Sequence, residues 1–317
     1  MKIRDVSLTR TPCPPALRTT TPERAIGLRL PMALGRSVVI NGDLGSGKTT
    51  VSVLLARQLG VRRISIGDLY RELAARRGLS ALQLNRHSEL DDTIDAHIDQ
   101  IQRDIVASGE QLVVDSRLAW HFFAGALKVH LITEPTVAAR RVLGRPTEVE
   151  NYATLEEART DLESRSESER IRFLAKYGVD KTRLRNYDTI CDSTRATPQE
   201  ILDTIIESLH ESELTASSGP ACYLDPQRIF PTAAVPAFDE SDSAEPIEVG
   251  YAARHFFAVR GHQRLGAAIR SGQSLVRASL AEEAISRPAD VTADRVHAWD
   301  RAFGIELPQL GALSQAG

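Results

Sequence analysis

The sequence contains little cysteine, and its three residues, Cys13, Cys191 and Cys222, lie far apart. Without a Cys-x-x-Cys pair they predict neither a zinc site nor a disulfide scaffold. No apolar run approaches the roughly 18 residues that cross a bilayer. Residues 1–35 lack the apolar stretch of a secretory signal peptide. These absences predict a protein of the reducing cytoplasm that has no membrane partner.

A strong excess of one charge is also missing. The chain carries 39 Lys and Arg against 42 Asp and Glu, which gives a net charge of −3. Domains whose main partner is nucleic acid are usually basic, so nucleic acid is not a partner we expect. The length of 317 residues is enough for two domains with hydrophobic cores.

What the sequence does contain is a glycine-rich loop, residues 42–49, which fits the pattern G-x-x-x-x-G-K-[ST]. Glycines let the backbone curl so that successive N–H groups form an anion nest. Lys48 is expected to reach the phosphates of a nucleotide, and the Thr49 hydroxyl to ligate Mg²⁺. An apolar run precedes the loop and a helical pattern follows it, which is the context a P-loop requires. The predicted ligands of ATP and Mg²⁺ are Gly42, Gly45, Ser46, Gly47, Lys48, Thr49 and Thr50.

Strand-like runs alternate with helical patterns from residue 36 to residue 210, which predicts an α/β domain with a parallel sheet and helices on both faces. A helix at 201–209 closes this domain, and 211–220 is typical of a linker. Residues 221–317 would form a small second domain with a tail, and residues 1–35 an N-terminal extension, either disordered or packed as a strand. The five predicted strands are 37–40, 63–66, 111–115, 128–132 and 188–191.

Charged residues follow the second and third predicted strands. Ligands of open α/β sheets bind at the carboxyl ends of the strands, so these residues are candidates for a site. We expect Asp68, Arg71 and Arg117 to contact an acceptor phosphate group or its nucleoside. Asp115 stands at the end of the third strand and is expected to hold Mg²⁺ or its waters, together with Thr49.

In these segments the chain resembles the cytidylate kinases, most closely the compact archaeal type. The resemblance covers nearly all of residues 37–210. It departs at Ser116, where the family usually has glycine, and at 146–153, a longer stretch that we interpret as an elaborated lid. Beyond the P-loop and the residues named above, it continues through 140–145, 155–158, 165–173, 177–180, 187–188 and 192–194.

The resemblance implies phosphoryl transfer from ATP to a nucleoside monophosphate, with CMP or dCMP as the expected acceptor. Such transfer depends on positioning and charge neutralisation. The expected lid arginines, which would close over the transferring group and exclude water, are Arg141, Arg145, Arg165 and Arg172. Two alternatives stay open at this point. One is a P-loop kinase of a small molecule or modified nucleotide, and the other is a nucleotide-sensing regulator that transfers nothing.

The last part of the chain contains a possible phosphate site of its own. A strand pattern at 255–259 enters a turn led by Gly261, and a helix follows. The free N–H groups and the dipole of such a helix favour an anion. His262 and Arg264 would lie at the mouth of this site.

Residues 222–283 resemble the ParB N-terminal/sulfiredoxin-like fold, a small α+β domain. The resemblance implies a nucleotide ligand bound through the Gly-x-x-Arg segment. It departs at Arg260, which precedes the glycine, and at Ala233, where enzymatic relatives often have glutamate. No helix-turn-helix pattern follows, so we expect no role in chromosome partitioning.

Overall fold

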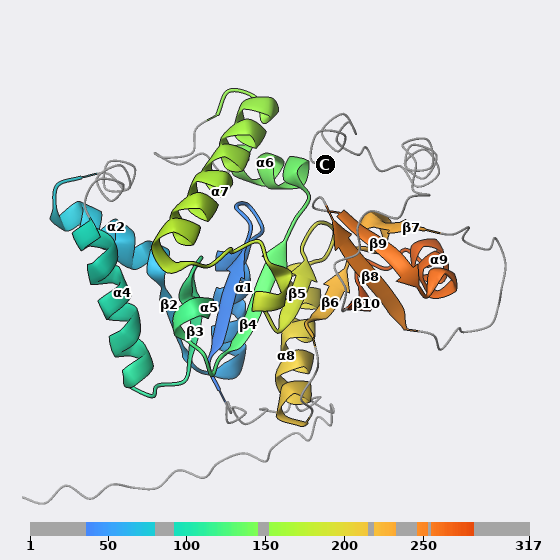
Figure 1. Ribbon diagram of the computed structural model, residues 1–317, viewed down its shortest axis with the longest axis horizontal. Coiled ribbons are helices and arrows are strands. Elements are labelled where there is room, and N and C mark those ends of the chain that lie inside the picture. The colour runs from blue at the N-terminus through green and yellow to red at the C-terminus, as the bar shows by residue number, and fades with distance from the viewer. Residues whose placement is uncertain are drawn as a thin grey trace, which may run out of the picture.

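The central feature of the computed structural model is one ten-stranded sheet in the order β2-β3-β1-β4-β5-β6-β10-β8-β9-β7 (Figure 1). The structure describes residues 36–79, 92–144, 152–214, 219–232, 246–252 and 255–281. The first five strands in this order are parallel to one another, which confirms the predicted P-loop kinase sheet. They are β1 (Val38–Gly42), β2 (Arg62–Ser65), β3 (Leu112–Asp115), β4 (Leu127–Ile132) and β5 (Thr189–Asp192).

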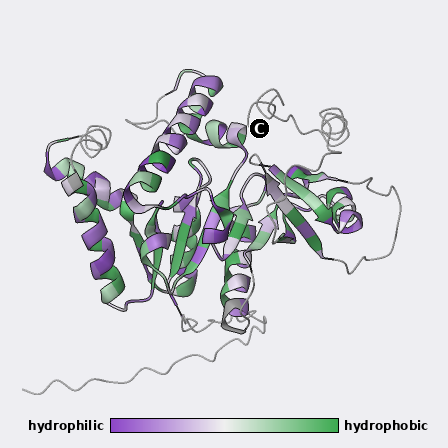
Figure 2. Cartoon of the chain, viewed as in Figure 1, coloured by the Kyte–Doolittle hydropathy of each residue, from purple (hydrophilic) through white to green (hydrophobic). Residues whose placement is uncertain are grey.

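Helices connect these parallel strands and cover both faces of the sheet. Strand β1 shows the division, because Val38 and Ile40 belong to one core and Val39 to another. A strand buried on both faces is expected to be continuously apolar, and Figure 2 shows hydrophobic residues in the central strands. The connecting elements are α1 (Lys48–Leu59), α2 (Ile66–Arg76), α4 (Asp92–Ala107), α5 (Ala119–Phe122), α6 (Pro135–Leu143), α7 (Leu155–Tyr177), the 3₁₀ turn η1 (Leu184–Asn186) and α8 (Pro198–Leu214).

The C-terminal strands continue the same sheet. Strand β6 pairs in parallel with β5, with Thr189 opposite Ala221 and Cys191 opposite Tyr223. Helix α8 runs to Leu214, so the first four residues of the predicted linker are helical. The division into two domains stays a prediction. The C-terminal elements are β6 (Ala221–Leu224), the 3₁₀ turn η2 (Pro226–Arg228), β7 (Ile229–Pro231), β8 (Ile247–Ala252), β9 (His255–Arg260), α9 (His262–Arg270) and β10 (Val276–Leu280).

One hydrophobic core crosses the boundary between the two halves of the sheet. It joins Ile132 and Ile190, from β4 and β5, to Phe256 and Leu265, from β9 and α9. The strands after residue 220 therefore do not have a core separate from that of β4 and β5. No helix in the described part of the chain is long and apolar enough to cross a membrane.

Two ion pairs whose carboxylates are buried connect the halves in opposite directions. Arg195, which follows β5, donates two hydrogen bonds of 2.8 Å to Asp225, which follows β6. In return Arg228 donates one of 2.6 Å to Asp192, the last residue of β5. The carboxylates are 2% and 0% exposed respectively. A buried carboxylate is strongly unfavourable unless it is paired, so each half requires an arginine from the other.

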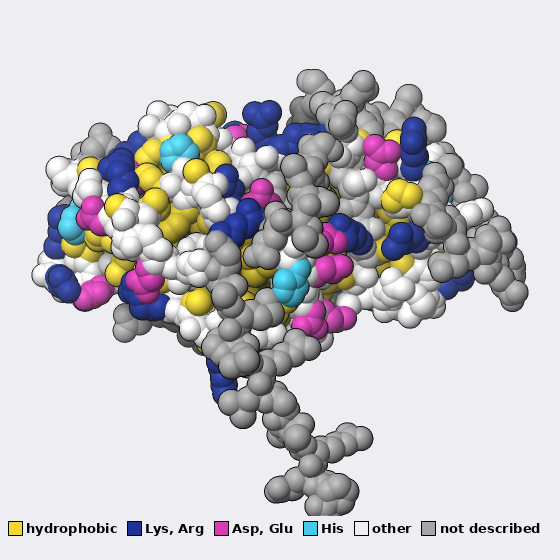
Figure 3. Space-filling view, turned by 90° about the horizontal axis from the view of Figure 1, so that it is seen from below, with side chains coloured by type: hydrophobic (Ala, Val, Ile, Leu, Met, Phe, Trp, Pro, Cys, Tyr) yellow, Lys and Arg dark blue, Asp and Glu magenta, His cyan; other side chains and the backbone are white. Residues whose placement is uncertain are grey.

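The surface charges are mixed. Figure 3, a view from below, shows basic and acidic side chains interspersed on that face. Some of them form exposed pairs, such as Arg62 with Glu110. Exposed pairs contribute little to stability because water and salt screen them.

The paired arginines allow a direct test. Arg195→Ala should lower the free energy of unfolding by about 3 kcal/mol, the lower end for a broken buried pair, because the carboxylate of Asp225 loses its partner. Urea denaturation measures this loss. Arg62→Ala is the control: it also removes an arginine from an ion pair, but an exposed one, and should leave stability nearly unchanged. Equal losses in the two variants would contradict a special role for the buried pair.

Candidate active site

The loop between β1 and α1 has the backbone that the glycine pattern predicts. Gly45 has a φ of +76°, and a Cβ there would lie 2.9 Å from Ala138 of α6, so no other residue fits without displacing the helix. Gly47, with a φ of +84°, precedes α1, and no side chain caps the helix. The first-turn N–H groups of α1 thus have no capping side chain, and a helix N-terminus of this kind binds phosphate.

Lys48 spans the loop. Its ammonium group donates hydrogen bonds to the carbonyl oxygens of Gly42, at 2.9 Å, and Asp43, at 2.7 Å. Burial and, to a lesser extent, the positive charge of Arg117 lower its pKa to about 8. Two cations from different elements are therefore close together, and a bound phosphate group would relieve their repulsion.

The predicted Mg²⁺ ligands, Thr49 and Asp115, are in hydrogen-bond contact. The hydroxyl of Thr49 donates to the carboxylate of Asp115 at 3.1 Å. Mg²⁺ is usually held by oxygens from one or two protein groups together with the phosphates of a substrate. This donor set fits that use. Arg63, which the sequence reading missed, donates to the same carboxylate oxygen of Asp115 at 2.9 Å.

Arg63 also joins Asp115 to the predicted acceptor residues on α2. Its second contact is Asp68, at 3.4 Å, and Asp68 pairs with Arg71. Asp68 and Arg71 are 53% and 64% exposed. The pair therefore lies at the surface, and Arg71 is engaged by a carboxylate of its own helix.

Arg117 is the predicted acceptor residue that contacts helix α7, and its side chain is 40% exposed. It pairs with Glu169 of α7, and Lys181 donates to the same carboxylate at 2.9 Å. Glu169 is only 8% exposed. Burial, followed by the charge of Arg117, lowers the pKa of Lys181 to about 8. The sequence carries no local signal for Lys181, since its partner lies 12 positions away on another segment.

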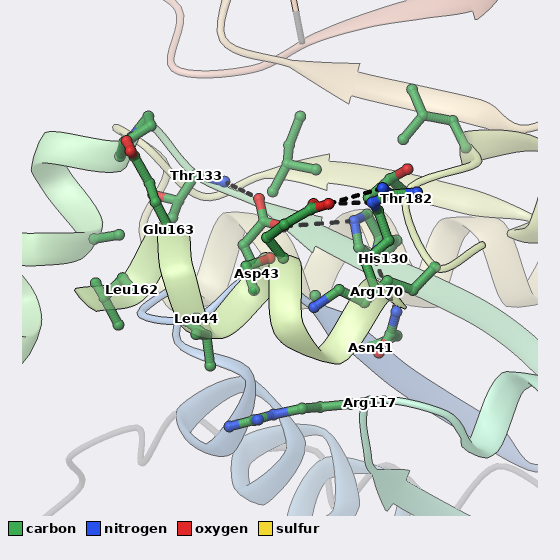
Figure 4. A pocket seen from close by; sticks show the side chains of 18 of the residues that line it. Asn41, Asp43, Leu44, Arg117, His130, Thr133, Leu162, Glu163, Arg170 and Thr182 are labelled. Carbon is green, nitrogen blue, oxygen red and sulfur yellow. Dashed lines mark hydrogen bonds and ion pairs between the residues drawn. The ribbon is translucent and has the colours of Figure 1, made fainter. Parts of the chain in front are cut away.

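A cavity of about 520 Å³ adjoins the P-loop. Its lining comes from residues 41–44, the end of β4, α6, α7 and the segment 181–184, and also from the C-terminal half. Figure 4 shows Asp43, Arg117 and Arg170, from three different elements, around it. Such a volume lies in the range of small-ligand sites.

Below the P-loop a buried polar cluster holds the end of β1. Asn41 donates to the hydroxyl of Tyr187 at 2.6 Å and contacts Nδ1 of His130 at 3.1 Å. The rings of His130 and Tyr187 stack with centroids 4.4 Å apart. Burial lowers the pKa of His130 to about 4, so this imidazole is neutral at physiological pH.

The predicted lid arginines do not converge on this cavity. Arg141 donates to the backbone oxygen of Ser193 at 2.6 Å and lies 3.4 Å from that of Gly45, and so connects the P-loop to the end of β5. Arg165 pairs with Asp161 on its own helix, and the guanidinium of Arg172 lies over Phe173. Arg145 lies outside the described residues. The α7 arginines that line the cavity are instead Arg159 and Arg170.

The predicted phosphate site of the C-terminal half is partly formed. Gly261 has a φ of +77° and begins α9. Nε2 of His262 accepts a hydrogen bond from the backbone N–H of Thr232 at 3.2 Å, so the imidazole contacts the end of β7, and Arg264 is exposed. A ligand at this site and the ParB/sulfiredoxin-like resemblance both stay predictions.

Comparison with known proteins identifies relatives of the first half. A family profile described as an AAA domain matches residues 38–171. The chain is 35% identical to a cytidylate kinase of Natronomonas pharaonis, over 54% of this chain and 87% of that protein. It is 33% identical to the cytidylate kinase of Haloarcula marismortui, over 58% of this chain and 94% of that protein.

Solved structures with a similar backbone include a shikimate kinase from Bacteroides thetaiotaomicron. The two are 19% identical, with a TM-score of 0.40, over 55% of this chain and 98% of that one. The strand order described above, not this likeness, supports the fold assignment.

The crowded glycine of the P-loop provides a test. Gly45→Ala should abolish measurable ATP·Mg²⁺ binding in calorimetry, because the added methyl group collides with α6 and the required φ is unfavourable for alanine. Gly67→Ala is the matched control. This glycine lies in the first turn of α2, and a Cβ there would meet only side chains at 3.7 Å or more, so ATP should bind normally. Unchanged binding in Gly45→Ala would mean that the loop does not hold the phosphates.

Proposed function

The chain belongs to the cytidylate kinase family, and from this premise we propose that it transfers the γ-phosphoryl group of ATP to CMP or dCMP. As a nucleoside monophosphate kinase it uses ATP and Mg²⁺. The observation that carries the proposal is the cavity beside the P-loop, because Asp43 of that loop and Arg117, from the segment after β3, both line it. The charge of Arg117 also acts on Lys48 of the same loop. A donor and an acceptor phosphate bound by these two groups would be neighbours.

The residues of the chain have separate tasks in this proposal. The P-loop N–H groups and Lys48 hold the donor phosphates, and Thr49 and Asp115 hold Mg²⁺. When bound, Mg²⁺ neutralises the charge on the donor phosphate oxygens. Arg117 and Lys181 neutralise the acceptor phosphate. Both cations line the cavity, where Glu169 holds them in place. Phosphoryl transfer then requires alignment of the two phosphates more than covalent help.

The remaining predicted residues have narrower proposed roles. Arg141 would steady the P-loop through Gly45 and the end of β5. Arg145, Arg165 and Arg172 are proposed as lid residues only because the chain resembles the cytidylate kinases. We place the enzyme in the cytoplasm, where its substrates are found, and propose 36–210 as the catalytic domain.

The function is tested by ADP release. Purified full-length protein with ATP·Mg²⁺ should release ADP on addition of CMP or dCMP, and far less on addition of UMP, AMP, GMP or no acceptor. Lys48→Ala should reduce this turnover by at least about a thousandfold, since the lysine stabilises the transferring charge. Calorimetry checks ATP binding in parallel. ATP binding without acceptor-dependent turnover would instead favour a nucleotide sensor.

Lys181 predicts a pH dependence. Its positive charge is present below a pKa of about 8 and is lost as the pH rises through that value. We therefore expect kcat/KM for CMP to fall above pH 8 at saturating ATP, where the donor phosphates keep Lys48 charged, because this parameter reports the groups of the enzyme before CMP binds. Lys181→Arg should move the fall to higher pH, since arginine stays charged. A pH profile unchanged by this substitution would assign the fall to another group, such as Lys48.

A further inference from the structure

The cavity beside the P-loop is completed by the C-terminal half of the sheet. Arg228 from η2, Tyr251 from β8 and Phe256 from β9 belong to its lining. We propose that these strands form one wall of the acceptor site and that the base of the acceptor nucleotide lies against Tyr251, whose ring is supported from behind by Phe256. This inference rests on the proposed kinase function. It assigns the C-terminal strands a role in binding the acceptor of that reaction.

The position of the cavity separates its occupant from the donor. It meets the P-loop at residues 41–44, so that Gly42 is the one predicted ATP ligand in its lining, whereas residues 45–50, which would hold most of the donor phosphate contacts, do not line it. The segment 193–197, which follows β5, is not part of it either. Arg117 does line it. The cavity therefore lies on the acceptor side of the transferring phosphate.

The chemistry of the lining changes along the cavity. Arg117, Lys181 and Arg170 supply positive charge, and Arg170 is paired with Glu167 at 2.7 Å. Ile132, Leu184 and the two aromatic residues supply apolar surface. A phosphate at the cationic groups and a flat ring at the apolar surface match a nucleoside monophosphate.

The ring of Tyr251 suits a base, and the buried ring of Phe256 supports it. The ring centroids of Tyr251 and Phe256 are 4.8 Å apart with an interplanar angle of 43°. Aromatic rings stack on any nucleobase through its π-face, so this surface provides affinity. Polar groups elsewhere in the cavity would then select the base.

The wall is held rigidly. Arg228 is anchored by Asp192 at 2.6 Å and by the hydroxyl of Thr194 at 3.0 Å. Phe256 is 2% exposed and packs in the core that also contains Ile132 and Leu184. A preformed wall binds its ligand without the entropic cost of ordering loops.

The experiment compares variants of the full-length chain. Tyr251→Leu removes the ring but keeps an apolar side chain, and should raise KM for CMP about tenfold while leaving KM for ATP unchanged. Calorimetric binding of CMP without ATP should weaken by the same factor. Arg260→Ala, at a side chain of β9 that is 72% exposed and is not in the lining, is the matched control and should behave as wild type. Phe256→Leu provides a second ring deletion, and thermal unfolding confirms that each variant is folded.

The outcomes separate the two proposals. If the wild-type protein shows no acceptor-dependent ADP release, the proposed kinase function fails, whatever the variants do. If the wild type is active and folded Tyr251→Leu and Phe256→Leu both keep the wild-type KM and Kd for CMP, the C-terminal wall does not bind the acceptor. A rise in KM for ATP alone would place the donor there instead and would also overturn the inference.

Discussion

The buried carboxylates at the junction of β5 and β6 constrain the whole molecule. Asp192 and Asp225 are each almost completely buried, and each is neutralised by an arginine from the opposite side of the junction. Burial raises the pKa of Asp192, and the charge of Arg228 opposes that effect. Because neither carboxylate tolerates the loss of its partner, the two halves of the sheet have one fixed relationship. Residues of both halves line the cavity beside the P-loop.

Above the sheet the charges are reversed, and buried cations depend on a carboxylate. Lys48, Arg117 and Lys181 are held close together, although like charges repel and burial disfavours them. The single carboxylate of Glu169 pairs with two of the three. Asp43 and Asp115 oppose the repulsion at Lys48, so the cations are partly balanced by nearby carboxylates. In the proposed transfer the phosphates are attracted to these cations.

A neutral polar cluster supports the loop from below. His130 stacks on Tyr187 and contacts Asn41, and its depressed pKa keeps it uncharged beneath the cations. A protonated imidazole there would add to the repulsion within the site. The P-loop thus has a rigid base at the end of β1, while Gly45 allows it to pass against α6.

The sequence by itself determined the features that depend on local order. The P-loop, the five parallel strands and α1 follow from glycine spacing and from apolar periodicity, both of which act between neighbours in the chain. Arg63, Glu169 and Lys181 escaped prediction because the contacts that bring them into the site, Arg63 with Asp115 and Glu169 with Arg117 and Lys181, join residues 12 to 52 positions apart in the sequence. The sequence predicted a linker at 211–220 and did not predict that the sheet continues beyond it. The pairing of β5 with β6 leaves no pattern in the local sequence. Only the tertiary structure decided that Tyr251 and Phe256 share a cavity with Arg117. The physical reason is that contacts between residues distant in the sequence determine which charges and which apolar side chains are buried together.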